Sequence, residues 1–167
     1  MQITLANQLI SCDVFVLPVY KGKKPQSKAL SSLSRNSNIL VTEALKSPEF
    51  EGGFGETLII QTAKDKASKI LIVSLGEEKD FTNEKLRRAF ATVSKKIKKA
   101  KQLCFDLNGL EAVPALEGFF LARYKFQHYL SKKIKDELKK VSLLGVSKNQ
   151  KKEIEKTQKV CEEVNYV

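Results

Sequence analysis

The chain has 167 residues, of which 42% are hydrophobic and 8% aromatic, and its 30 Lys and Arg against 19 Asp and Glu give a formal net charge of +11. This length and composition supply the core of one globular domain, which excludes an intrinsically disordered chain. The longest apolar run, at residues 14–19, is far below the roughly 18 residues that cross a bilayer, which excludes a transmembrane helix.

Two strands and a loop are predicted at the N-terminal end. Residues 3–5 alternate weakly and predict a short edge strand. Residues 13–19 form a continuous apolar run typical of a buried parallel strand, with Pro18 near its end, where a missing N–H donor is tolerated. The lysine- and serine-rich segment 20–38 predicts an exposed loop.

The first helix is predicted to begin near Ser37, with Ser37 or Asn36 as its N-cap, and to stop at Pro48. Its apolar face is expected to hold Ile39, Leu40, Ala44 and Leu45. After this helix, residues 57–62 and 69–75 predict two strands that lie next to each other in the sheet.

Residues 80–101 predict an amphipathic helix with Thr82 as its N-cap. A central strand follows at 102–107, then a turn at Asn108-Gly109. The apolar face of the helix is expected to contain Leu86, Ala89, Phe90, Val93, Ile97 and Ala100.

Residues 112–133 combine helical apolar spacing with a high density of aromatic side chains. The C-terminal end of this predicted helix is basic, which is favourable because that end is the negative pole of the helix dipole. The apolar stripes contain Leu116, Phe119, Phe120, Tyr124, Phe126 and Leu130, and the basic end contains Lys132, Lys133 and Lys135. A last strand is predicted at 141–146.

The final segment, 149–167, predicts a helix with a thin apolar stripe that needs a packing partner. The stripe contains Ile154, Val160, Cys161 and Val164. Strands that alternate with helices, most of them apolar on both faces, predict an α/β fold. We expect three layers, α/β/α, around a mixed, largely parallel sheet.

Candidate catalytic and metal-binding groups do not form a recognisable pattern. The carboxylates beside predicted buried elements are Asp13, Glu56, Asp106 and Glu117, and no pair has a metal-ligand spacing. His128, the only histidine, is interpreted as a partly exposed surface residue rather than a ligand. We therefore predict no catalytic, cofactor or metal residues in this chain.

Glycines 52, 53 and 55 invite comparison with phosphate-binding loops. In those loops the glycines follow a strand and open a helix, whereas here they precede a strand, so we interpret them as a turn. Basic helix faces offer an alternative contact with DNA or phosphate, although a solvated face is the default interpretation. The residues concerned are Arg87, Arg88, Lys95, Lys96, Lys98 and Lys99.

The cysteines and the N-terminus predict a cytosolic protein. Cys12, Cys104 and Cys161 are odd in number and widely spaced, as expected for reduced thiols rather than disulfides. The first residues have neither the basic nor the apolar region of a signal peptide.

Several segments, in order, resemble the N-terminal domain of the leucyl (cytosol) aminopeptidase family. They are the Leu-Pro-Val-Tyr end of the first long strand, the Gly-Glu-Thr turn at 55–57, residues 70–76, residues 84–88, the helix 112–133, residues 143–145 and residues 162–165. The resemblance implies a macro-domain-like domain at 1–147 and, at 148–167, a linker helix toward a C-terminal catalytic domain.

The resemblance also implies a function. The parent would be a cytoplasmic homohexamer that removes N-terminal amino acids with two divalent metals, zinc or manganese. Its ligands, catalytic lysine and arginine belong to the C-terminal domain, so this chain would be architectural or regulatory and inactive alone. Two alternatives stay open: a basic DNA-binding accessory protein, or a macro-type module for ADP-ribose or a nucleotide if the strand ends form an open pocket.

Overall fold

The computed structural model describes residues 1–25, 27–128 and 136–164, with residues 124–128 described by their backbone alone. It contains one six-stranded sheet in the order β1-β6-β5-β2-β4-β3. All neighbouring strands are parallel except β3 and β4, so the predicted mixed, largely parallel sheet is confirmed. The strands are β1 Gln2–Ala6, β2 Cys12–Val19, β3 Thr57–Gln61, β4 Ala67–Ser74, β5 Gln102–Asp106 and β6 Lys140–Leu144.

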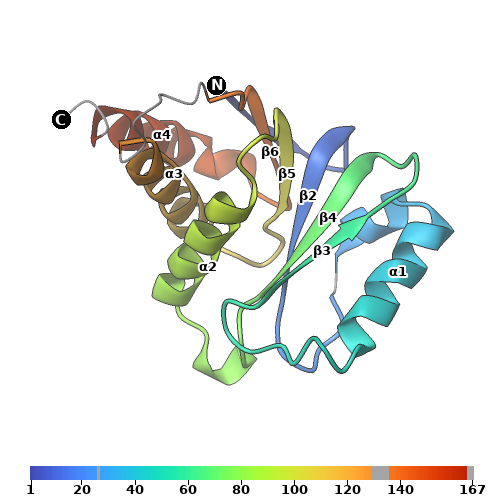
Figure 1. The fold of residues 1–167 in the computed structure, drawn as a ribbon. Helices are drawn as coiled ribbons and strands as arrows, with labels where there is room; N and C mark the ends of the chain where they lie inside the picture. The colour runs from blue at the N-terminus through green and yellow to red at the C-terminus, as the bar shows by residue number, and fades with distance from the viewer. Residues whose placement is uncertain (26, 129–135, 165–167) are drawn as a thin grey trace.

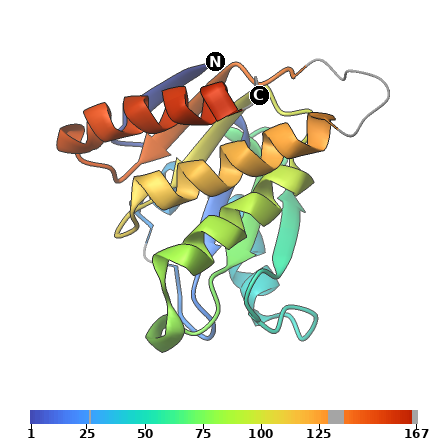
Figure 2. The same cartoon turned by 90° about the vertical axis from the view of Figure 1, so that its left-hand side faces the viewer.

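Helices cover both faces of the sheet, which confirms the three-layer α/β fold. α2, α3 and α4 lie side by side on one face, and α1 lies on the other (Figures 1 and 2). The helices are α1 Arg35–Lys46, α2 Asn83–Lys96, α3 Ala112–His128 and α4 Lys151–Val164, with short 3-10 helices at Lys28–Ser32, Glu78–Asp80 and Lys148–Gln150. None of the helices in the described part of the chain is long and apolar enough to cross a bilayer.

The predicted pairing of the second and third long strands is confirmed, and its direction follows from the connection. Only residues 62–66 join β3 to β4, and a link of this length allows an antiparallel hairpin but no parallel crossover. β3 is therefore the antiparallel strand at one edge of the sheet, while β1 forms the other edge, as predicted.

The first helix differs from its prediction. α1 starts earlier, because Ser34 is the N-cap and its hydroxyl accepts a hydrogen bond from the Ser37 amide. Ile39 and Leu40, which were expected on the buried face, are 44% and 39% exposed, whereas Val41 is only 2% exposed. The prediction of an exposed loop at 20–38 is also wrong in part, because a 3-10 helix forms there and buries Ala29 and Leu33.

The second helix begins as predicted and ends five residues early. The Thr82 hydroxyl caps α2 by accepting a hydrogen bond from the Lys85 amide, but Ile97 already leaves helical geometry. The turn that follows is held by Asp13, whose carboxylate accepts hydrogen bonds from the amides of Lys101 and Gln102, at 2.7 and 3.0 Å. These bonds direct the chain into β5.

The aromatic helix is confirmed as α3 and forms the centre of the larger core. Leu116, Phe119 and Phe120 are at most 1% exposed. The Phe119 ring meets Phe105 of β5 edge to face, with ring centroids 5.0 Å apart, and Phe105 meets Phe90 of α2 in the same way. The predicted roles of the Tyr124 and Phe126 side chains, and of Leu130, Lys132, Lys133 and Lys135, lie outside the described residues.

The C-terminal helix finds part of its packing partner within the domain. α4 lies against α3 and buries Ile154, Thr157 and Cys161, so Ile154 and Cys161 find within this chain the packing partner that the sequence predicted they need. Val160 and Val164 are 49% and 56% exposed. The apolar stripe is therefore divided between an internal contact and an open surface.

Candidate functional site

The carboxylates that the sequence placed beside buried elements do not converge. Asp13 holds the turn before β5, while Glu117 of α3 accepts hydrogen bonds from Arg87 of α2 at 2.9 and 2.7 Å. Within the described ranges, no three His, Cys, Asp or Glu side chains gather as metal ligands would. The His128 side chain lies outside the described residues. The chemistry of this donor set suits cross-links between elements and does not fit a metal pair.

The glycine turn holds one of the chain's own carboxylates. Gly52 and Gly55 have φ values of +77° and +81°, a conformation that glycine adopts without strain. The Glu56 carboxylate accepts hydrogen bonds from the amides of Glu51, Gly52 and Gly53, at 3.2, 3.0 and 3.1 Å. Since these amides already surround a carboxylate, the turn is not an open phosphate loop, in agreement with the sequence interpretation.

A concave region lies at the carboxyl ends of the central strands β2 and β5. From β2 the chain continues to α1 on one face, and from β5 it continues to α3 on the opposite face. A crevice forms at such a switch point in an α/β sheet, and ligands bind there in many proteins. Here a cavity of about 580 Å³ is lined by residues of both strand ends, among them Tyr20, Lys23, Lys24, Asp106 and Asn108.

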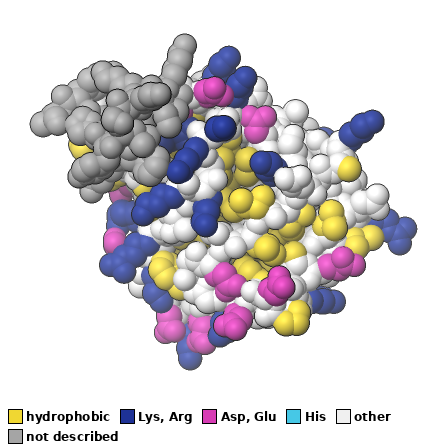
Figure 3. Space-filling model, viewed as in Figure 1, with side chains coloured by type: hydrophobic (Ala, Val, Ile, Leu, Met, Phe, Trp, Pro, Cys, Tyr) yellow, Lys and Arg dark blue, Asp and Glu magenta, His cyan; other side chains and the backbone are white. Residues whose placement is uncertain are grey.

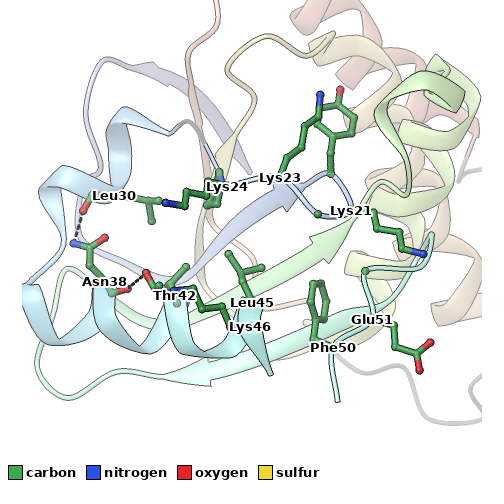
Figure 4. A pocket seen from close by; sticks show the side chains of 15 residues that line it. Lys21, Lys23, Lys24, Leu30, Asn38, Thr42, Leu45, Lys46, Phe50 and Glu51 are labelled. Carbon is green, nitrogen blue, oxygen red and sulfur yellow. Dashed lines mark hydrogen bonds between the residues drawn. The ribbon is translucent and has the colours of Figure 1, made fainter. Parts of the chain in front are cut away.

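A second cavity, of about 550 Å³, opens on the other side of the loop 20–25 and shares Tyr20, Lys23 and Lys24 with the first. Figure 4 shows Leu45 and Phe50 beside this space, with lysines around it. We name the two cavities together the switch-point crevice.

The switch-point crevice carries ionisable groups of both signs. Burial raises the pKa of the Asp106 carboxyl, although hydrogen bonds from Ser27 and the Asn108 amide oppose that shift. Burial also raises the pKa of the Tyr20 hydroxyl. Lys23 forms an ion pair with Glu78. The exposed Lys24 adds positive charge at the rim that the loop 20–25 presents.

The side chains predicted to contact DNA separate into two groups. Arg87 and Arg88 both form ion pairs with Glu84, and Arg87 also pairs with Glu117. The lysines lie two turns or more further along, at the end of α2 and in the turn beyond it. They are Lys95, Lys96, Lys98 and Lys99. DNA contact by this set stays a prediction, but the two arginines already have carboxylate partners.

The cysteines are free and buried, as predicted for reduced thiols. Cys12 and Cys104 lie on the adjacent strands β2 and β5, and a hydrogen bond to Cys104 together with burial raises the pKa of Cys12. Burial also raises the pKa of Cys161, to about 11. A thiol with a raised pKa is a poor nucleophile, which agrees with a structural role for Cys12 and Cys161.

Sequence reasoning missed two features. The first is Arg123 of α3, which is buried, donates to the Asp136 carboxylate at 2.8 and 2.6 Å and donates to the Ile97 carbonyl at 2.9 Å. Its spacing from Phe119 and Phe120 placed an arginine on the buried face, which was the available signal. The second is the loop 20–25. Its lysines line the switch-point crevice because the folded sheet places this loop beside the end of β5 at Asp106.

Comparison with known proteins gives one consistent result. A family model described as the cytosol aminopeptidase family, N-terminal domain, matches residues 16–133. A probable cytosol aminopeptidase of Alkaliphilus oremlandii is 33% identical over 72% of this chain and 26% of its own length. Another, of Clostridium perfringens, is 31% identical over 90% of this chain and 31% of its own length. The chain thus spans between about a quarter and a third of the length of these curated relatives.

Solved structures share the fold at lower identity. A mutant of tomato leucine aminopeptidase matches with a TM-score of 0.71 at 15% identity, over 96% of this chain and 36% of that one. A mutant macrodomain of Oceanobacillus iheyensis matches with a TM-score of 0.66 at 16% identity, over 96% of this chain and 92% of that one. The predicted macro-domain-like fold is confirmed.

Proposed function

This chain belongs to the cytosol aminopeptidase family, whose N-terminal domain it carries, and from that premise we propose that it is the non-catalytic, architectural or regulatory part of a leucyl aminopeptidase. The parent protein would remove N-terminal amino acids from peptides in the cytoplasm as a homohexamer. Its two divalent metals, zinc or manganese, would belong to a C-terminal catalytic domain. Residues 148–167 would connect the two domains.

The observation that carries this proposal is the use of the carboxylates. Asp13, Glu56 and Glu117 each hold a turn or join two helices through their own hydrogen bonds. Recruiting them to a metal would break those contacts, so they serve as structural groups. The exposed Val160 and Val164 on α4 further support a contact with another domain, because they extend the stripe that already packs on α3.

The test is hydrolysis of leucine amide by the purified chain with added Mn²⁺ or Zn²⁺. We expect no turnover above the metal-only rate. A fusion that places this chain before the C-terminal part of the Clostridium perfringens relative is expected to hydrolyse the amide, whereas that C-terminal part alone is expected to lose activity or assembly. Metal-dependent turnover by this chain alone would refute the proposal.

The switch-point crevice favours a second candidate, a nucleotide or ADP-ribose module. The crevice is open, its two cavities together have room for such a ligand, and the exposed Lys24 can attract phosphates. The test is calorimetric titration with ADP-ribose and with ADP, on the wild type and on Lys24→Glu. This candidate requires saturable binding that Lys24→Glu weakens; the absence of heat at millimolar ligand would remove it.

A further inference from the structure

A separate groove lies at the opposite end of the parallel strands from the switch-point crevice. It is a cavity of about 690 Å³ between the sheet and the turn that follows α2. Its apolar lining comes from the three strands β2, β3 and β4 and from that turn. The apolar residues are Val14, Ile59, Leu71, Ile97 and Ala100. We name it the lysine-rimmed groove.

The rim of this groove is strongly basic. Lysines from β4, from the last turn of α2 and from the following turn surround the apolar lining: Lys69, Lys95, Lys96, Lys98, Lys99 and Lys101. The one carboxylate in the lining, Asp13, already accepts two backbone hydrogen bonds. The helix dipole accounts for cations in the last turn of α2, but not for those on β4 or beyond residue 97.

Figure 3 shows the face that carries the groove. Hydrophobic side chains gather over its middle, Lys and Arg side chains predominate above and to their left, and most of the visible acidic side chains lie lower. Ile59 lines the groove, is 48% exposed and pairs with Leu71 across β3 and β4. Together with the apolar lining of the groove, this side chain forms a surface that apolar side chains of a partner can cover.

β3 adds a second opportunity for contact. It is the edge strand beside β4, and its sequence Thr-Leu-Ile-Ile-Gln contains neither the charged residues nor the proline that commonly protect sheet edges. The groove therefore opens next to an edge whose backbone groups can pair with a further extended segment.

We propose that the lysine-rimmed groove binds an acidic polypeptide segment whose apolar side chains enter the groove while its Asp and Glu side chains pair with the lysines. The charge of the rim selects the acidic partner, and the apolar lining selects a polypeptide with hydrophobic side chains. A second copy of this chain suits the groove poorly, because each copy carries a net charge of +11.

Nucleic acid also suits it less well. None of the described residues that line the groove is aromatic, so bases have no stacking partner there. Contacts with phosphate alone would leave the apolar lining and Ile59 unused.

The test uses two synthetic peptides of equal length and equal glutamate content. In one, leucines are interspersed among the glutamates; in the other, serines replace the leucines. By fluorescence polarisation with the full chain, we expect the leucine peptide to bind at least about tenfold more tightly, as burial of one or two apolar side chains requires. Equal affinity for the two peptides would overturn the proposal.

Variants locate the site. Lys95→Glu with Lys99→Glu is expected to weaken both peptides, whereas Ile59→Ser should lower the affinity for the leucine peptide to about that for the serine peptide. Lys148→Glu with Lys152→Glu makes the same change in net charge at the other end of the sheet and is the matched control. Thermal melting verifies that each variant is folded.

Two results would refute the assignment. One is an unchanged affinity of Ile59→Ser for the leucine peptide. The other is that a DNA duplex of equal charge binds more tightly than the leucine peptide, with binding that Lys95→Glu with Lys99→Glu abolishes and Ile59→Ser does not affect. That result would assign these lysines to nucleic acid.

Discussion

The crossing of α2 and α3 depends on the absence of a side chain at Gly118. A Cβ atom added there would lie 1.9 Å from the carbonyl oxygen of Arg87 and 2.7 Å from its carbonyl carbon. Close C···O contacts in proteins are about 3.3 Å or longer, so Gly118→Ala requires the two helices to separate by more than about 1 Å. The obstacle is backbone, which cannot rotate away as a side chain would.

The cost follows from what surrounds the crossing. Leu86 and Phe90 of α2, and Phe119 of α3, are fully buried near it, so separating the helices would loosen the larger core. Overpacking costs about 1–3 kcal/mol and occasionally more. Alanine gains about 1 kcal/mol over glycine in helix propensity, which offsets part of this. We expect a net loss of about 2 kcal/mol, which lowers the melting temperature by about 4–8 °C in a chain of this size.

The assay is thermal and urea unfolding followed by circular dichroism. Gly53→Ala is the matched control, because its added Cβ would meet only a Glu56 carboxylate oxygen at 3.9 Å, and its effect should stay within about 0.5 kcal/mol. A double variant, Gly118→Ala with Arg87→Ala, separates backbone from side chain and should remain about 2 kcal/mol less stable than Arg87→Ala alone, because the clash is with the backbone. Wild-type stability of Gly118→Ala, or its rescue by Arg87→Ala, would refute the reasoning.

Three further predictions concern carboxylates. Asp136→Asn removes the charge partner of the Arg123 side chain, which is 6% exposed, and should cost about 3 kcal/mol in urea unfolding; a loss below the 0.5 kcal/mol typical of surface changes would contradict this. Burial alone would raise the pKa of Asp65, but hydrogen bonds from Ser37, Ser34 and Lys66 outweigh it and lower the pKa to about 2. Its contribution to stability is therefore complete above 3.8 and lost as the pH falls toward 2, so Asp65→Asn should flatten the decline in melting temperature over that interval. Glu56→Gln leaves one acceptor oxygen for three amides and should cost about 1 kcal/mol, measured against Glu49→Gln on the exposed surface.

Elements with a strong pattern were predictable from the sequence. The apolar runs of β2, β4 and β5 needed only local information, because a strand buried on both faces is apolar at every position. The N-cap at Thr82 was visible for a similar reason, since the cap and its helix are adjacent in the chain.

Features that depend on distant partners were not predictable. Ser34 caps α1 together with Asp65, and α2 ends early because Asp13 holds the turn at Lys101. Asp65 lies 31 residues from Ser34 in the sequence, and Asp13 lies 88 residues from Lys101. The switch-point crevice was missed for the same reason, since its lining comes from strand ends that become neighbours only in the folded sheet.

The parallel pairing of β1 with β6 has a consequence for synthesis on the ribosome. The first five residues of the sheet find their partner more than 130 positions later, and the Gln158 side chain of α4 then binds the Met1 carbonyl at 3.1 Å. Until β6 emerges, the N-terminal strand has no neighbour to pair with and remains available to other chains. Closing so long a loop is slow, so the edge formed by β1 is completed only after most of the chain has been synthesised.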